Sequence, residues 1–331
     1  MPHTTARPAH RRFALSLLMA AGALATPAAA QTYPDKTVTL VVGFPPGGSL
    51  DTVARALADE LTKLLGQKFI VDNKPGAGGN LATTAVLNAP ADGYSLLLAA
   101  INLATAPAMS GVRYDPKADL AMVSQVTSVP VLMLTSGKGK LNTAADVITE
   151  SKATAGGLKM GSGGIGTSGH LAIELLALSQ KIPFLHVPYK GGAAANLAVI
   201  GGEVDIIYDL GSGSLKSFLE AGSIKPLAVM QETRVASLPN VKTAKELGLP
   251  PDTYIRSWQG IAVKAGTPKP IVDKLHKAVL AAADTPAFRA RAWQLGSEVV
   301  TSKTPEVFQQ FHNAELDRWT AVIKAAGIKS Q

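Results

Sequence analysis

Residues 38–51 read Val38-Thr39-Leu40-Val41-Val42, followed by Gly43-Phe44-Pro45-Pro46-Gly47-Gly48-Ser49-Leu50-Asp51. An apolar, strand-like run enters a glycine-rich loop, and apolar residues at helical spacing follow the loop. The same order recurs at residues 69–80 and 158–170. Glycine lets the backbone approach a ligand closely, and the start of a helix presents unpaired N–H groups at its positive end. Several such loops at the ends of different strands predict a pocket in which backbone donors hold an anion.

Residues 1–30 are typical of a secretory signal peptide. A basic start, an apolar core and a small-residue cleavage site are formed by Arg7, His10, Arg11 and Arg12, by residues 13–24, and by Ala28-Ala29-Ala30. The apolar core is short for a membrane span, and no second long apolar stretch follows it. The pair Arg11-Arg12 leaves open whether export uses the general or the twin-arginine route. We expect a bacterial periplasmic protein whose mature chain starts near Gln31.

The composition excludes several classes of protein. The chain has no cysteine, which excludes disulfides, a thiol nucleophile and lipid attachment to an N-terminal cysteine. The formal net charge of +8 becomes +5 when the three arginines of the signal peptide are removed. Basic residues are scattered singly without interleaved aromatic residues, so a nucleic acid partner is not expected. A mildly positive chain suits an anionic ligand.

Helix and strand patterns alternate, which is typical of parallel sheets covered by helices on both faces. Strands are expected at residues 38–42, 69–71, 94–99, 129–135, near 159, 184–187, 204–208, 225–230 and 257–263. Helices are expected at residues 50–65, 81–88, 144–153, 170–179, 193–200, 215–221, 268–283, 286–295 and 305–326. The helical C-terminal part leaves two arrangements open: two α/β domains in series, or two lobes with the last helices packed on the first lobe.

Eight longer motifs follow one another along the mature chain. They are residues 44–49 with Asp51; 71–79; 91–94; Ser162, Gly164, Gly166, Thr167 and His170; 186–192; 201–205; 227–229; and 266–268. In this order they resemble the periplasmic solute-binding proteins of tripartite tricarboxylate transporters, the Bug or TctC family. The resemblance covers essentially the whole mature chain.

The resemblance implies a two-lobed α/β fold of the type II periplasmic binding protein class, also called a Venus flytrap. Lobe 1 would comprise residues 31–128 and 232–331, and lobe 2 residues 129–231. A small carboxylate (a di- or tricarboxylate, an acidic amino acid or an aromatic acid) would bind between the lobes. Membrane subunits resembling TctA and TctB would recognise the closed form. We expect a monomer without a cofactor, a metal ion or enzymatic activity.

The ligand-binding positions that the resemblance implies lie in two loops and at one strand end. They are Phe44, Gly47, Gly48, Ser49 and Asp51 in the first loop, Ser162, Gly164, Thr167 and His170 in the second, and Asp209. Leu50 departs from the family pattern, because a small hydroxyl residue is common at this position. It predicts a drier pocket wall.

Three charged residues also have a plain structural interpretation. Asp51 would lie in the first turn of a helix, where the dipole favours an acid; in a cleft it would repel an anion and instead order water or loop N–H groups. Asp209 could cap the next helix, or it could favour a ligand that carries an amine or a protonated group. Lys190, a cation in a glycine-rich loop, would either contact the ligand or be solvated.

Enzyme motifs are incomplete in this chain. Gly161, Gly163 and Gly166 match a dinucleotide-binding fingerprint, but residues 182–186 contain no acid for the ribose. Ser168 and His170 lack the nucleophile-elbow pattern, and the histidines of the mature chain lack metal-ligand spacing. An enzyme using the same cleft, and a sensor or scavenger without a transporter, are the alternatives to a transport protein.

Overall fold

The computed structural model describes residues 1–3 and 33–328 of the chain. Met1–Asp35 and Lys36–Gln331 are two separate units, and the fold described here belongs to the second. The predicted signal peptide falls mainly on residues 4–32 and therefore lies outside the described residues.

The strands of the second unit form a continuous arrangement through one long strand, β4. The strands are β1 (Val38–Val42), β2 (Phe69–Asn73), β3 (Ser95–Ala100), β4 (Leu120–Ser136), β5 (Leu158–Ser162), β6 (Phe184–Pro188), β7 (Ile206–Leu210), β8 (Ile224–Val229), β9 (Arg256–Lys264) and β10 (Glu298–Val299). Their order is β2-β1-β3-β9-β4-β7-β5-β6, and β8 and β10 also pair with β4.

Two sheets share β4. In sheet A, β1 is parallel to β2 and β3, whereas β9 is antiparallel to β3 and β4. In sheet B, β5 is parallel to β6 and β7, whereas β4 is antiparallel to β7 and β8. The prediction of parallel sheets is therefore wrong for the central strands β4 and β9, which are antiparallel to the strands on either side of them.

The long strand β4 changes partner near its middle. Its first part, up to Pro130, pairs with β9, and from Val131 onward it pairs with β7. The sequence predicted only residues 129–135 of this strand. Proline has no N–H to donate to a ladder, so Pro130 stands where one pairing ends and the next begins.

The helices agree with the predicted ranges within a few residues, with one omission among the α-helices; the short 3₁₀ helices η2 and η3 were not predicted either. They are α2 (Ser49–Leu65), η2 (Ala77–Gly79), α3 (Asn80–Asn88), α4 (Ile101–Ser110), α5 (Ala144–Ala153), α6 (Ser168–Gln180), α7 (Gly192–Gly201), α8 (Gly213–Glu220), η3 (Pro251–Thr253), α9 (Lys269–Asp284), α10 (Pro286–Gln294) and α11 (Pro305–Ala326). The omission is α4, which contains Pro107. Proline in a helix interior removes a hydrogen bond, so this segment had no clear helix pattern.

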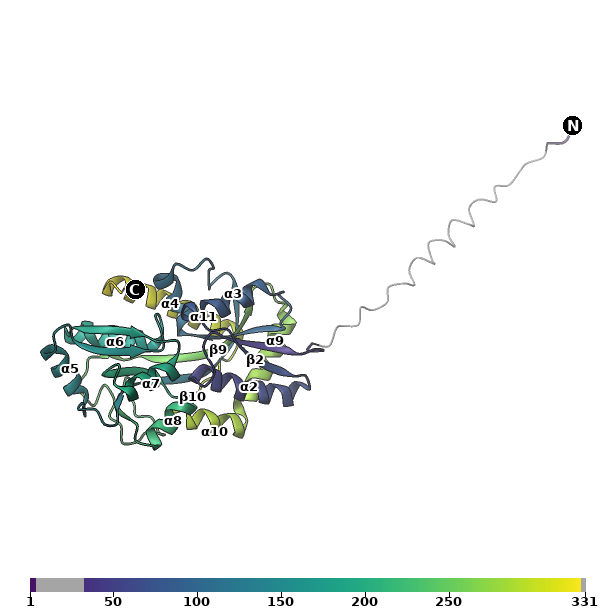
Figure 1. Cartoon of the computed structure of the whole chain (residues 1–331). Coiled ribbons are helices and arrows are strands. Elements are labelled where there is room, and N and C mark those ends of the chain that lie inside the picture. Colours follow the sequence, from purple (N-terminus) through teal and green to yellow (C-terminus); the bar gives the residue numbers. More distant parts are fainter. Residues whose placement is uncertain (4–32, 329–331) are drawn as a thin grey trace. The chain divides into compact units, whose positions relative to one another are not determined.

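The C-terminal helices pack on the elements of sheet A. α9 and α10 contact α2, and α11 contacts α4 and β4. In Figure 1, α10 lies beside α2 and α11 lies beside α4. Of the two arrangements left open by the sequence, the structure therefore has the one in which the chain returns to its first part. The residue boundaries of the two lobes stay a prediction.

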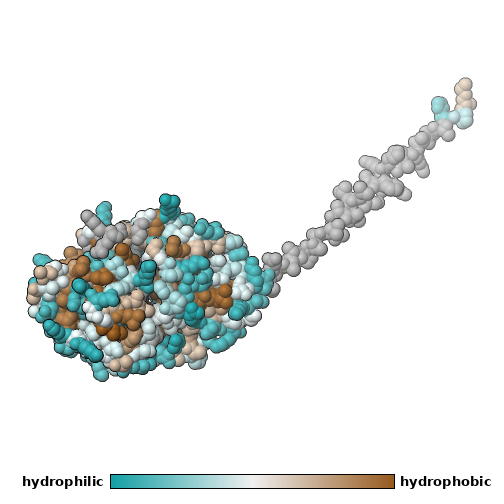
Figure 2. Space-filling model, in the orientation of Figure 1, coloured by the Kyte–Doolittle hydropathy of each residue, from teal (hydrophilic) through white to brown (hydrophobic). Residues whose placement is uncertain are grey.

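Apolar side chains fill the space between sheet B and its helices. Leu132 of β4, Ile207 of β7 and Val199 of α7 belong to one buried cluster. On the visible face in Figure 2, hydrophobic residues lie in separate patches among hydrophilic ones. Among the described residues, every helix is too short or too polar to cross a membrane.

Gly211 provides a test of how closely the chain segments pack. A Cβ added at Gly211, which follows β7, would lie 1.6 Å from the carbonyl oxygen of Leu295, which follows α10. We expect Gly211→Ala to lower the free energy of unfolding by about 1–3 kcal/mol or more, because backbone would have to move. Urea unfolding measures this change. Gly201→Ala is the matched control, since nothing lies within 4 Å of its added Cβ; equal stability of both variants would contradict the packing.

Candidate ligand-binding site

A cavity of about 60 Å³ lies where the first turns of four helices converge. Its wall includes the N-cap and the first two residues of each helix: 48–50 at α2, 100–102 at α4, 167–169 at α6 and 191–193 at α7. Each of these helices directly follows a strand: β1, β3, β5 and β6, respectively. Two of the three loops predicted to form a pocket, those after β1 and β5, thus border this cavity. The third, at residues 75–80 after β2, lines a larger groove. The cavity has room for a few water-sized groups and suits a small molecule.

Three of these four helices begin without a side-chain cap. The N-cap residues are Gly48 for α2, Ala100 for α4 and Gly191 for α7, and none of them supplies a side-chain acceptor. A helix usually satisfies its first N–H groups with Ser, Thr, Asp or Asn at this position. Uncapped starts leave donors at the positive end of each helix dipole available to a negative ligand group.

Helices that begin away from the cavity mostly do have such caps. The side chains of Thr143, Ser212, Thr285 and Thr304 cap α5, α8, α10 and α11. The contrast is not complete, because Thr167 caps α6 at the cavity, while α3 and α9 lack a side-chain cap and lie outside its wall. The uncapped starts of α2, α4 and α7 are nevertheless the main polar feature of the cavity.

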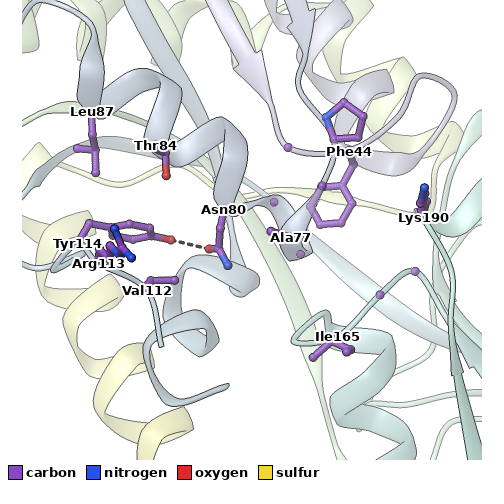
Figure 3. Close-up of a pocket in the computed structure, with 18 of the residues that line it drawn as sticks. Phe44, Ala77, Asn80, Thr84, Leu87, Val112, Arg113, Tyr114, Ile165 and Lys190 are labelled. Atoms are coloured by element: carbon purple, nitrogen blue, oxygen red, sulfur yellow. Dashed lines mark hydrogen bonds between the residues drawn. The ribbon is translucent and has the colours of Figure 1, made fainter. Parts of the chain in front are cut away.

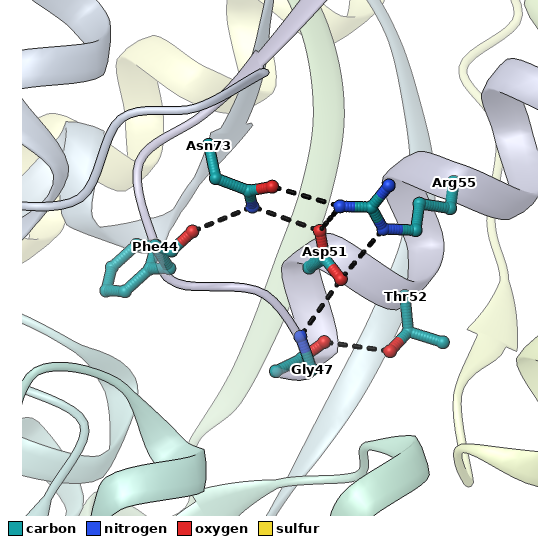
Figure 4. Close-up of polar contacts among 7 residues, drawn as sticks. Phe44, Gly47, Asp51, Thr52, Arg55 and Asn73 are labelled. Carbon is teal, nitrogen blue, oxygen red and sulfur yellow. Dashed lines mark hydrogen bonds and ion pairs between the residues drawn. The ribbon is translucent and has the colours of Figure 1, made fainter. Parts of the chain in front are cut away.

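Asp51 holds the first loop in shape through hydrogen bonds (Figure 4). Its carboxylate accepts hydrogen bonds from the N–H of Gly47 (3.0 Å), from Nε of Arg55 (3.1 Å) and from Nδ2 of Asn73 (3.0 Å). Nδ2 of Asn73 also donates to the carbonyl of Phe44 at 2.9 Å. Burial alone would raise the pKa of Asp51, but these hydrogen bonds and the charge of Arg55 lower it. Asp51 is buried outside the cavity wall, where it orders a loop N–H group.

The other first-loop residues divide between the cavity and its surroundings. Phe44, Gly48 and Ser49 line the cavity, as does Leu50. The Ser49 hydroxyl accepts a hydrogen bond from Nε2 of Gln259 at 3.0 Å. Gly47 is exposed, with φ +88°, and its carbonyl accepts a hydrogen bond from Ser214 at the start of α8.

The second loop is built around Ser162 and Thr167. The Ser162 hydroxyl is buried, accepts a hydrogen bond from the N–H of Gly164 (3.2 Å) and lies 2.8 Å from Nε2 of His186. The Thr167 hydroxyl donates to the carbonyl of Gly164 at 2.7 Å. Thr167 lines the cavity, Gly164 lines a larger groove, and Ser162 lies behind the loop.

His170 also lies behind this loop, stacked on His186. The two rings are 4.1 Å apart between centroids and nearly parallel. Nδ1 of His170 accepts a hydrogen bond from the N–H of Gly166, and its Nε2 lies 3.3 Å from a carboxylate oxygen of Glu174. Burial, and secondarily the charge of His170, lowers the pKa of His186 to about 3. Both imidazoles therefore support the backbone of the loop from within the protein.

Asp209 is an acidic residue in the cavity wall. It is partly exposed and accepts a hydrogen bond from Nδ2 of Asn196 at 3.0 Å. Desolvation raises its pKa to about 6, although hydrogen bonds from the Leu210 backbone and Asn196 act in the opposite direction. A Cβ on Gly192 would lie 2.3 Å from Oδ1 of Asp209, so the start of α7 must be glycine here.

A groove of about 1,200 Å³ adjoins the cavity (Figure 3). Phe44, Pro45, Gly163, Lys190 and Gly191 line both spaces. Its outer wall includes Arg113 and Tyr114, whose hydroxyl donates to Oδ1 of Asn80 at 2.7 Å. The groove therefore provides an approach to the cavity past Phe44 and Lys190.

The sequence analysis did not assign two parts of the cavity wall to the site. The start of α7 follows the same strand–glycine–helix pattern, through Gly191 and Gly192, and this signal could have identified it. The start of α4 has Ala100, Ile101 and Asn102 in the cavity wall without any glycine, so no local signal marked it. Lys190 lines the cavity and is exposed, so ligand contact and solvation both stay predictions.

The chain matches the family model of the tripartite tricarboxylate transporter family receptor, TctC, over residues 53–328. The chain belongs to this family. BugT of Bordetella pertussis is 32% identical to it over 319 residues, which cover 95% of this chain and 97% of BugT.

Solved structures of TctC-type proteins have the same fold. The periplasmic binding protein BugD has a TM-score of 0.85 and 34% identity, over 90% of this chain and 100% of BugD. MatC from Rhodopseudomonas palustris with bound malate has a TM-score of 0.82 and 32% identity, over 88% of this chain and 100% of MatC. Rpa4515 from R. palustris with adipate has a TM-score of 0.85 and 32% identity, over 90% of this chain and 100% of Rpa4515. These matches confirm the resemblance and the two-lobed periplasmic binding protein fold.

The buried His186 behind the second loop should make the free energy of unfolding depend on pH. His186 is neutral in the folded protein, whereas in the unfolded chain it takes up a proton near its ordinary pKa of 6.5. The free energy of unfolding should therefore fall as the pH drops below 6.5, by at most about 1.4 kcal/mol per pH unit for this group. We expect His186→Gln to show a weaker loss between pH 7 and pH 5 in urea unfolding. Parallel losses in the two proteins would contradict this assignment.

Proposed function

We propose that this protein is a periplasmic solute-binding protein that captures a small carboxylate and delivers it, chemically unchanged, to a tripartite tricarboxylate-type membrane transporter. The observation that carries the proposal is the convergence of the uncapped starts of α2, α4 and α7 on one small cavity. Membership of a transporter receptor family, and the malate and adipate bound by MatC and Rpa4515, support it.

Backbone donors are strong enough for such a role. Hydrogen bonds to a charged group contribute roughly 1.5–3 kcal/mol each. Several of them supply the roughly −8 kcal/mol that corresponds to micromolar binding. The hydroxyl of Ser49 accepts from Gln259 and keeps its proton for a ligand in the same wall, whereas the hydroxyl of Thr167 already donates to Gly164. We therefore infer that the proposed ligand-binding residues act in two ways: Phe44, Gly48, Ser49, Thr167 and Asp209 at the cavity, and Gly47, Asp51, Ser162, Gly164 and His170 by shaping the loops.

Ligand binding would be coupled to the relative position of the two lobes. We propose residues 31–128 and 232–331 as lobe 1 and residues 129–231 as lobe 2, with the cavity between them. Two hydrogen bonds join the proposed lobes. The Thr105 hydroxyl of α4 donates to the carbonyl of Gly166 at 2.7 Å, and the Ser214 hydroxyl donates to the carbonyl of Gly47 at 3.1 Å. Membrane subunits of the TctA and TctB type would recognise the closed arrangement of a monomeric receptor.

A ligand screen on the mature protein tests the proposal. We expect thermal unfolding to be shifted upward by at least one mono-, di- or tricarboxylate, and not by a neutral sugar or an inorganic cation. At a concentration one hundred times the dissociation constant, the stabilisation should be about 2.7 kcal/mol. Mass spectrometry should recover the acid unchanged after incubation. A response to the sugar alone, or conversion of the acid into a product, would refute the proposed function.

A proline substitution tests the contribution of backbone N–H groups directly. Ser49 is the first residue of α2, a position that tolerates proline, and Gly48 before it is extended with ψ 176°. Ser49→Pro removes one N–H and the hydroxyl, whereas Ser49→Ala removes only the hydroxyl. We expect Ser49→Pro to bind the best acid of the screen about 10-fold or more weakly than Ser49→Ala, the equivalent of about 1.5 kcal/mol. Calorimetry on folded samples measures the difference, and equal affinities would exclude this N–H as a ligand contact.

A further inference from the structure

The charges in the cavity wall are balanced and are not purely positive. Among the described residues that line the cavity, Lys190 is the one cation and Asp209 is the one anion. Lys190 is exposed and also lines the groove, so its charge lies at the approach to the cavity. No described ion pair involves Asp209, and the amide of Asn196 is its side-chain partner. The cavity of a receptor for acids thus contains a carboxylate without a cationic partner.

The position of Asp209 gives the cavity two chemically different sides. Asp209 belongs to β7 of sheet B and lies against the start of α7, whereas α2 and α4 approach from sheet A. A ligand carboxylate gains most at the starts of α2 and α4, away from the like charge. The opposite end of the ligand then meets Asp209. A second carboxylate there would be repelled, whereas an ammonium group would form a charge-assisted hydrogen bond.

We propose that Asp209 is a specificity-determining residue, through which the cavity selects acids that carry an ammonium group over plain acids with the same carbon skeleton. This inference rests on the proposed function, because it assumes that the acid binds in this cavity. A zwitterion matches a wall that offers N–H donors on one side and a carboxylate on the other. Its ammonium group compensates the partly desolvated charge of Asp209.

The two ligand classes should respond to pH in opposite directions. An ammonium group favours ionised Asp209, so its affinity should fall as the pH drops through about 6. A diacid favours protonated Asp209, so its affinity should rise over the same range. Neither α4 nor α7 has a titratable side chain, and Leu132 of β4 is paired with Asp209. The other titratable side chains on the surrounding helices and on β7 are Lys190 before α7, Tyr208 on β7, His170 and Glu174 on α6, and Asp51, Arg55, Asp59, Glu60 and Lys63 on α2. Tyr208 stays neutral because burial raises its pKa.

Calorimetric titration with matched pairs of acids provides the test. The pairs are propionate and alanine, succinate and aspartate, and glutarate and glutamate, with malate as the hydroxyl counterpart of aspartate. At pH 7.5 we expect the amino member of the best-binding pair to bind at least 10-fold more tightly. Lowering the pH to 5 should reduce this preference at least threefold. The pH series uses the unaltered protein, so it does not depend on any variant folding.

Two variants separate the role of Asp209 from a general charge effect. Asp209→Asn should reduce the amino-acid preference to less than threefold, and Glu220→Gln, the same change at an exposed residue of α8, should preserve it. Tighter binding of the plain acid or of malate to the parent protein, or an unchanged preference in Asp209→Asn, would overturn the proposal while leaving the proposed function intact. Failure of every acid to bind the parent protein would overturn the proposed function and this inference with it.

Discussion

The proposed function depends on one interaction, the attraction between helix N–H groups that lack side-chain partners and the negative charge of a ligand. Four strands end at one place, and the helices that follow direct their first turns at a single cavity. Three of these helices begin at Gly48, Ala100 or Gly191, which leaves their donors without side-chain partners. Four of the six described α-helices that begin away from the cavity, α5, α8, α10 and α11, have Ser or Thr at the same position. The missing caps are therefore a local cost to helix stability that a bound anion would offset.

Backbone N–H groups can hold a ligand only if the loops that carry them are fixed, and polar side chains behind the cavity fix both loops. Asp51 joins the first loop to Arg55 and Asn73, and the stacked His170 and His186 lie under the second loop. These side chains lie outside the cavity wall, yet the position of each N–H group depends on them. A substitution in this layer would change ligand binding indirectly, by displacing backbone.

The sequence predicted most individual elements because each strand–loop–helix unit has a local signal. The glycines after β1 and β5 also placed Gly48, Ser49 and Thr167 in the pocket wall. Local patterns do not report pairing between distant segments. Parts of β4 and β9 were therefore predicted as strands, but their antiparallel direction was not. Ala100 at the start of α4 has no distinctive neighbour, and Pro107 argued against a helix there. Whether Asp51 or Asp209 faced the cavity depended on a side chain's position in three dimensions, and both alternatives remained open until the fold was known.

The single strand shared by the two sheets also constrains the mechanics of the molecule. Because β4 pairs with β9 up to Pro130 and with β7 from Val131, the sheets are joined by continuous backbone with no flexible linker at this point. A rotation of one sheet relative to the other must be stored as elastic twist in this strand. Such a joint favours a small rocking motion over sliding, so in the proposed closure the same cavity walls would meet in the same register.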